Sequence, residues 1–158
     1  MDVRKLTTFE DIFSQFLSKI TDYELGNLVD EEFRQDLENK LKVALTQFSS
    51  NVRNSIEVDY TSKTLSNPTN IDSNGELTPL EINCLVYWML YGWVSPYVNN
   101  EEVLKMGIAS QDYEKLSRAN HLDKLKATSS SIMKEAKRLT TRYGYVNLKK
   151  RVGKKWTI

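Results

Sequence analysis

The segment that decides the fold runs from Thr78 to Tyr91 and reads TPLEINCLVYWMLY. It opens with the signals of a helix N-terminus: Thr78 as the cap, Pro79 at the first helical position and Glu81 at the third. From Cys84 onward the residues are apolar around the whole circumference of a helix, which is typical of a helix buried on all sides. One small domain is not expected to cover such a helix completely, so we expect part of it to face a neighbouring subunit. The residues assigned to that subunit interface are Tyr87, Trp88, Tyr91 and Trp93.

Two residues beyond this segment predict that its helix bends or stops. Gly92 lowers helix propensity, and Pro96 lacks the amide hydrogen that an interior helical residue donates. A short acidic helix is then expected to begin at Asn99 or Asn100 and to contain Glu101 and Glu102.

Helices are also predicted on both sides of the central one. Thr8 and Asp11 resemble a capping box at the start of an apolar stripe that repeats with helical period. A second helix is expected from Glu31 to about Ser50, and a long last helix from Gln111 or Arg118 to Tyr143, ended by Gly144. The stripe of the first helix consists of Phe9, Ile12, Phe13, Phe16, Leu17 and Ile20.

Residues 51–77 break this pattern, because Asn, Ser, Thr and Pro dominate there. Only Ile56–Tyr60 alternates as a strand does, so a short β-hairpin is one interpretation of this loop. The predicted fold class is therefore all-α: a small bundle of about four to five helices with a long C-terminal helix and an extended basic tail.

The net charge of +1 hides a strong asymmetry along the chain. Residues 1–114 carry nineteen acidic and nine basic side chains, whereas residues 115–158 carry thirteen basic ones against Asp123 and Glu135. A basic end on an acidic body is typical of an interaction segment. We therefore divide the chain into a helical domain, residues 1–144, and a basic C-terminal arm, residues 145–158.

Composition favours an intracellular protein without a membrane segment. Cys84 is the single cysteine, so an internal disulfide is excluded and a reducing compartment fits. Met1–Lys5 carries charge, but the segment that follows alternates apolar with polar residues, so we expect no secretory signal. The most apolar run, Cys84–Val94, is about half the roughly 20 residues that a membrane-spanning helix needs.

Residues able to carry catalysis are scarce, so we do not expect an enzyme or a cofactor. His121 is the single histidine and lies on a predicted helix, and Cys84 falls where the chain is most apolar, which predicts a buried, unreactive thiol. Ser129–Ser131 lacks the glycines of a nucleophile elbow. Phosphate-loop and dinucleotide-binding fingerprints are missing from the sequence.

One stretch matches part of a calcium-binding EF-hand loop, which wants oxygen ligands, a glycine turn and a bidentate glutamate. An asparagine at the first position, Pro79 at the tenth and the weak helical signal before the loop argue against calcium. The same letters also fit an Asn–Gly turn followed by a helix cap, so we expect no metal here. The matching residues are Asn70, Asp72, Asn74, Gly75, Leu77 and Glu81.

The basic arm has two open interpretations. Lysines and arginines that meet phosphates release counterions, which gives salt-dependent binding to any nucleic acid sequence. An acidic protein surface would attract the same charges, and composition alone favours neither partner. The residues assigned to partner binding are Lys149, Lys150, Arg151, Lys154, Lys155 and Trp156.

The order of several motifs resembles a known family. The stretches that carry the likeness are Phe9–Tyr23, Leu77–Glu81, Trp93–Asn99, Ser117–Leu125 and Glu135–Tyr143. Together they resemble small neck proteins of tailed bacteriophages of Gram-positive hosts, the head-to-tail connectors, also called adaptors or head-completion proteins. The likeness covers roughly residues 8–145, and none of its motifs is catalytic.

The resemblance implies a structural virion protein, assembled in the host cytoplasm and located in the phage neck. Such a protein would form a homo-oligomeric ring, of twelve copies in this family, that binds the portal protein and the next neck or tail protein and extends the DNA channel. It also implies non-specific contact with packaged DNA. The alternatives from the residues alone are a nucleic-acid-binding regulator that uses the basic helix and arm, and a calcium-binding interaction protein.

Overall fold

The structure, a computed structural model, describes residues 6–20, 30–53, 55–107 and 112–153, with side chains for 6–20, 31–53, 55–99 and 122–148. These residues are mostly helical, with one small antiparallel sheet. The helices are α1 (Phe9–Leu17), α2 (Asp30–Asn51), α3 (Pro79–Gly107) and α4 (Asp112–Gly153), and η2 (Ile71–Ser73) is a single 3-10 turn. The strands are β1 (Thr7–Thr8), β2 (Glu57–Asp59) and β3 (Thr64–Ser66).

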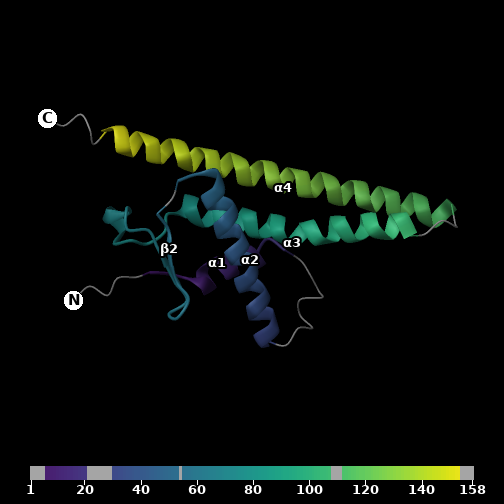
Figure 1. The fold of residues 1–158 in the computed structure, drawn as a ribbon, viewed down its shortest axis with the longest axis horizontal. Coiled ribbons are helices and arrows are strands. Elements are labelled where there is room, and N and C mark those ends of the chain that lie inside the picture. Colours follow the sequence, from purple (N-terminus) through teal and green to yellow (C-terminus); the bar gives the residue numbers. More distant parts are fainter. Residues whose placement is uncertain (1–5, 21–29, 54, 108–111, 154–158) are drawn as a thin grey trace.

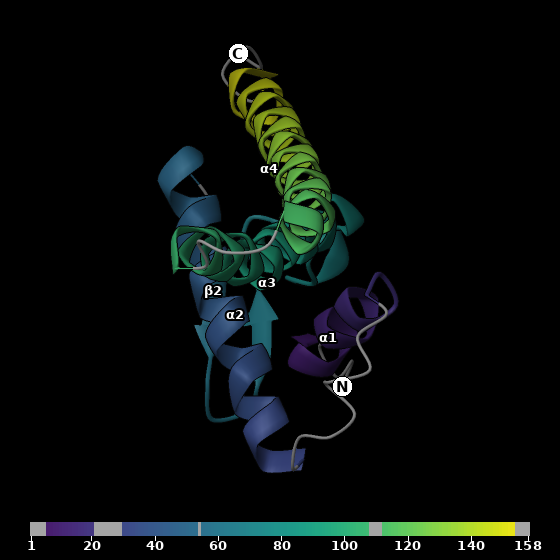
Figure 2. The ribbon, with the colours of Figure 1, turned by 90° about the vertical axis from the view of Figure 1, so that its right-hand side faces the viewer.

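The central element is α3, because α1, α2 and α4 all pack against it. Figure 2 looks along α3 and shows α1, α2 and α4 on different sides of it. Figure 1 shows α3 and α4 running side by side in opposite directions, and at one end this pair extends well beyond α1, α2 and the sheet. The molecule therefore consists of a packed body and a projecting pair of helical segments, the end of α3 and the start of α4, which we call the α3–α4 projection.

The core lies in the body and is formed by the apolar stripes that the sequence predicted. Ile12 and Phe16 of α1, Leu41 of α2, and Leu85 and Met89 of α3 are each at most 1 % exposed. Burying a side chain of this size stabilises the folded state by about 1.5–3 kcal/mol. The helical part of the predicted fold class is confirmed.

The expected hairpin is also present within the 51–77 loop. β2 and β3 pair antiparallel with Val58 opposite Leu65, and β1 pairs with the other edge of β3, with Thr7 opposite Leu65. The chain reverses at Lys63, which has a positive φ of 55°. Leu65 is buried and belongs to the same hydrophobic core as the apolar side chains of α1, so the sheet packs against the helical body.

The alternative that α3 ends at Gly92 or Pro96 is wrong. The helix continues from Pro79 to Gly107 with Pro96 inside it, and no separate acidic helix begins near Asn99 in the part of the chain that the structure describes. A proline ring clashes with the backbone carbonyl of the residue four positions earlier, which here is Gly92. Apart from the helix's own backbone, nothing lies within 4 Å of where a Cβ of Gly92 would be, so no neighbouring element crowds the helix there.

The prediction that Gly144 terminates the last helix is also wrong. α4 runs through Gly144 to Gly153, so residues 145–153 of the basic arm are helical rather than extended. A Cβ at position 144 would lie 3.3 Å from Cγ1 of Val52, at the end of α2. Gly144 therefore marks a close approach between two helices, and the division between residues 144 and 145 falls inside one helix.

Candidate functional site

A buried carboxylate organises the loop that precedes α3. Glu81 is 1 % exposed, and its Oε2 accepts hydrogen bonds from the Thr78 amide at 2.7 Å and the Thr78 hydroxyl at 2.8 Å. The same oxygen accepts from Nδ2 of Asn70 at 2.8 Å, and Oε1 accepts from Nδ2 of Asn67 at 2.5 Å. The predicted capping box is therefore present, with two loop asparagines added to it.

This geometry argues against the calcium interpretation. Asn70 turns its amide nitrogen, not its oxygen, toward Glu81 and the carbonyl of Glu76. Calcium needs oxygen ligands, and both oxygens of Glu81 already accept hydrogen bonds. Asp72 is exposed, and among the described residues no group of three His, Cys, Asp or Glu side chains could hold a metal ion.

α4 closes the other side of this polar cluster. Nδ2 of Asn67 lies 3.5 Å from the Tyr143 hydroxyl. Burial, together with the negative charge of Glu81, raises the pKa of Tyr143 to about 12. One turn away, Nε1 of Trp88 donates to the Thr140 hydroxyl at 3.0 Å, and that hydroxyl donates to the carbonyl of Ala136 at 2.7 Å.

The position of Trp88 corrects the predicted subunit interface. Trp88 is 3 % exposed and makes its hydrogen bond within the chain, so it is a core residue and is not available to a neighbour. Tyr87, Tyr91 and Trp93 are half-buried. Their assignment to a subunit interface stays a prediction.

The expected burial of Cys84 is confirmed. Its side chain is fully buried, and burial raises the pKa of the thiol to about 12, with the nearby charge of Glu81 adding to the effect and a hydrogen bond with Thr140 opposing it. A thiol with such a pKa is almost entirely protonated at neutral pH and is a poor nucleophile. The side chain of His121 lies outside the described residues.

A groove lies where the end of α2 meets the C-terminal half of α4. Its volume is about 510 Å³, and Gly144 and the neighbouring Val52 form part of its wall. Tyr145 is 68 % exposed and Leu148 63 % exposed, which leaves an apolar rim facing solvent. We call this surface the α2–α4 groove; its lining is Asn51, Val52, Arg53, Lys137, Thr140, Thr141, Gly144, Tyr145, Asn147 and Leu148.

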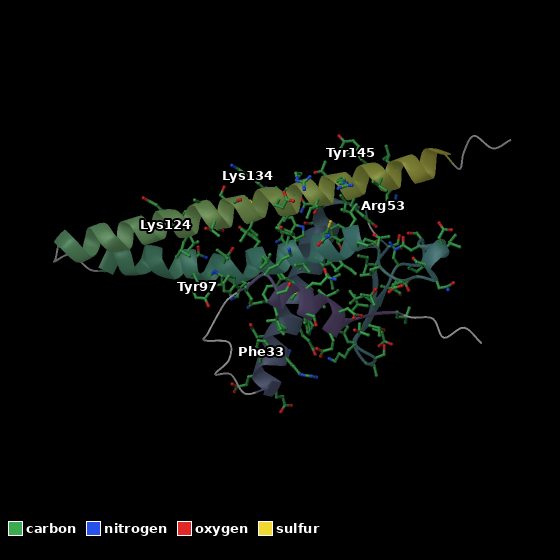
Figure 3. All side chains as sticks on the ribbon, turned by 180° about the vertical axis from the view of Figure 1, so that it is seen from behind. Phe33, Arg53, Tyr97, Lys124, Lys134 and Tyr145 are labelled. Carbon is green, nitrogen blue, oxygen red and sulfur yellow. The ribbon has the colours of Figure 1, made fainter. Side chains whose placement is uncertain are left out.

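α4 also carries exposed positive charges outside the groove lining. Lys124 and Lys134 project from the side of α4 turned away from α3, as does Tyr145 (Figure 3). Arg142 is also exposed. Arg138 forms an ion pair with Glu135, with Nη2 and Oε1 2.6 Å apart. Of the predicted partner-binding residues, Lys149, Lys150 and Arg151 belong to the helical part of α4, and Lys154, Lys155 and Trp156 lie outside the described residues.

Sequence reasoning missed the α2–α4 groove because it ended the last helix at Gly144. Once the helix is extended, Lys137, Thr141, Tyr145 and Leu148 recur at spacings of four, four and three, which places them on neighbouring turns. Arg53 and Val52 carry no sequence signal that would bring them to the same place.

Comparison with known protein families, curated proteins and solved structures found no match to this chain. No helix in the described ranges is long and apolar enough to cross a membrane.

Proposed function

We propose that this chain is a structural protein of a tailed-phage neck, where copies form a ring that joins the portal to the tail around the DNA channel. The observation that carries the proposal is the α3–α4 projection together with the exposed apolar end of α4. Tyr145, Val146 and Leu148 are 68, 40 and 63 % exposed within one turn of α4. Contiguous exposed apolar side chains are typical of interaction surfaces.

The projection supports the same proposal. Figure 1 shows that the start of α4 and the end of α3 lie beyond α1, α2 and the sheet, so among the described elements each has only the other beside it. A long helical pair of this kind offers a neighbour or a partner protein a large surface. The resemblance of several motifs between about residues 8 and 145 to phage connectors, in the same order apart from the differently composed segment 51–74, supports this choice of assembly.

A gene deletion in the parent phage tests the proposal. Without the connector, we expect DNA-filled heads and free tails that do not join, visible by negative-stain electron microscopy. Supplying the wild-type chain from a plasmid should restore complete particles. Complete tailed particles in the deletion strain would refute the neck assignment.

DNA binding by α4 is a second candidate, favoured by the exposed Lys124, Lys134 and Arg142. Each phosphate contact lowers the logarithm of affinity by about 0.9 per decade of salt. We therefore expect Lys124→Glu with Lys134→Glu to weaken duplex binding and flatten its salt dependence. Equal affinity and slope in wild type and variant, measured by fluorescence anisotropy, would exclude this face.

The helical continuation of α4 changes how the basic arm is tested. Removing residues 145–158 would cut α4 beside its close contact with Val52, and would disturb the fold as well as the charge. A chain that ends at Gly153 leaves the whole of α4 in place. Comparing it with the full chain separates the contribution of residues 154–158 from that of the helix.

A further inference from the structure

The two ends of α2 carry opposite kinds of surface. At its start, one face is acidic and polar and bears no basic residue; we call it the α2 acidic face, formed by Glu31, Glu32, Gln35, Asp36 and Asn39. At its end lies the α2–α4 groove, whose two charged residues are Arg53 and Lys137. Figure 3 shows Arg53 near one end of α2 and Phe33 near the other. A helix of 22 residues is about 33 Å long, so the two surfaces are well separated.

The charges on both surfaces are available. Glu31 and Glu32 are exposed and pair with no basic side chain among the described residues, although Asp36 does pair with Lys40 at 2.9 Å. Arg53 and Lys137 are likewise exposed and form no ion pair within the described part of the chain. Two acidic and two basic groups thus have no ion-pair partner among the described residues.

The apolar residues match as well. Val43 lies one helical turn after Asn39 and continues the same stripe of α2, and it is 51 % exposed. The groove offers Tyr145 and Leu148 as its exposed apolar rim. Each surface therefore combines one sign of charge with exposed apolar area, which is the usual composition of an interface.

We propose that the α2–α4 groove of one copy binds the α2 acidic face of the next copy. Because the two surfaces differ, the contact is head-to-tail, and such contacts build a ring when the rotation between copies closes. This inference rests on the proposed ring and names the surfaces that join its subunits. Charge complementarity sets the register of the contact, and the apolar rim covers Val43.

Complementary charge reversals test the pairing. The groove variant carries Arg53→Glu and Lys137→Glu, and the face variant carries Glu31→Lys and Glu32→Lys. Each variant alone places like charges across the contact, so we expect self-association to weaken roughly tenfold or more. Mixed in equal amounts, the two variants place opposite charges at every contact, and sedimentation velocity should show association restored.

Matched controls carry the same change of charge elsewhere. Lys124→Glu with Lys134→Glu alters basic residues of α4 that do not line the groove, and Glu57→Lys with Asp72→Lys alters exposed residues outside the acidic face. Both controls should associate as wild type does. Thermal unfolding of all four variants separates a lost contact from a lost fold.

A cross-link detects the contact even when it is weak. Cysteines placed by Glu32→Cys and Leu148→Cys should form an intermolecular disulfide ladder under mild oxidation, while the buried Cys84 stays reduced. Glu57→Cys with Leu148→Cys is the control and should form none. A wild-type protein that stays monomeric, together with a Glu32→Cys, Leu148→Cys protein that forms no ladder, would overturn the proposed contact.

The outcomes also separate this inference from the proposed function. If the charge variants self-associate as wild type does and still complement the gene deletion, the ring stands and its subunits join through other surfaces. If they fail to associate and fail to complement, and the mixture restores both, contact and ring are supported together. Complete particles in the deletion strain with an intact charge effect would refute the neck assignment and keep the contact.

Discussion

Two helices of this protein begin with the same device in two different environments. At α1, the Thr8 hydroxyl accepts from the Asp11 amide at 3.2 Å, and Oδ2 of Asp11 accepts from the Thr8 amide at 2.9 Å. At α3, Thr78 and Glu81 repeat both bonds at 3.3 and 2.7 Å. Asp11 is exposed to solvent, whereas Glu81 is 1 % exposed.

The comparison shows that burial, not the motif, sets what a cap contributes. When an exposed cap is removed, water replaces the lost bonds. When a buried one is removed, its donors are left without partners and their full desolvation penalty appears. Glu81 also binds Asn67 and Asn70, so it ties a loop to α3, while Asp11 bonds only within its own capping box among the described residues.

Glu81→Ala should lower the free energy of unfolding more than any other change to the two caps. It removes the acceptor that the buried amides of Asn67 and Asn70 share with the half-buried Thr78, and we expect a loss of about 3–5 kcal/mol in the free energy of unfolding. Urea unfolding followed by circular dichroism measures it, with the exposed Glu57→Ala as control. A loss below about 1 kcal/mol would show that the hydrogen bonds of Glu81 are not shielded from water.

Asn67→Ala removes the amide that links Glu81 to the loop. Its Nδ2 donates to Glu81, and its Oδ1 accepts from the amide and the hydroxyl of Thr69 at 3.0 and 2.6 Å. We expect a cost of about 2–3 kcal/mol by the same urea measurement. Combined with Glu81→Ala the two losses should fall short of their sum, because the residues share one bond. Full additivity would contradict the coupling.

Tyr143→Phe should cost about 1 kcal/mol at neutral pH and change the response to alkali. The pKa of Tyr143 is raised from 10.0 to about 12 in the folded state, so the unfolded chain releases this proton first. Stability from this group is therefore complete below pH 10 and is lost as the pH rises toward 12, by about 1.4 kcal/mol per pH unit.

The variant lacks this titration, so its stability should fall less than that of wild type between pH 10 and 12. Cys84 titrates over an overlapping range in both proteins and cancels in the difference. Urea unfolding at several pH values provides the comparison. Parallel curves for the two proteins would mean that Tyr143 is not shielded from water.

Asp11→Ala should have the smallest effect, about 0.5–1 kcal/mol, because water takes over the bonds of an exposed cap. Thermal unfolding resolves a change of this size. Asp11→Asn, which keeps an acceptor but not the charge, should lie between the alanine variant and wild type. A loss as large as that of Glu81→Ala would remove the distinction between the two caps.

Both caps were predictable because each is written within four consecutive residues. The helical stripes were predictable too, since period alone places Phe16 and Leu41 inside. Gly92 with Pro96, and Gly144, predicted helix ends that the structure does not have. α3 continues past Pro96, and α4 continues past Gly144, where Val52 lies 3.3 Å from the position of an added Cβ. The bond between Trp88 and Thr140 depends on how α3 and α4 pack, and nothing local in the sequence reveals it.

The spacing of the buried bonds has a consequence for how the chain folds. The α1 cap joins positions three apart, whereas Trp88 and Thr140 are 52 positions apart and Asn67 and Tyr143 are 76 apart. Contacts across long separations form late, because chain entropy must be lost before they stabilise anything. At roughly ten residues per second, a ribosome takes about six seconds to pass from Glu81 to Tyr143. During that interval Glu81 can bond only residues already made, such as Asn67, Asn70 and Thr78, and Tyr143 joins the cluster afterwards.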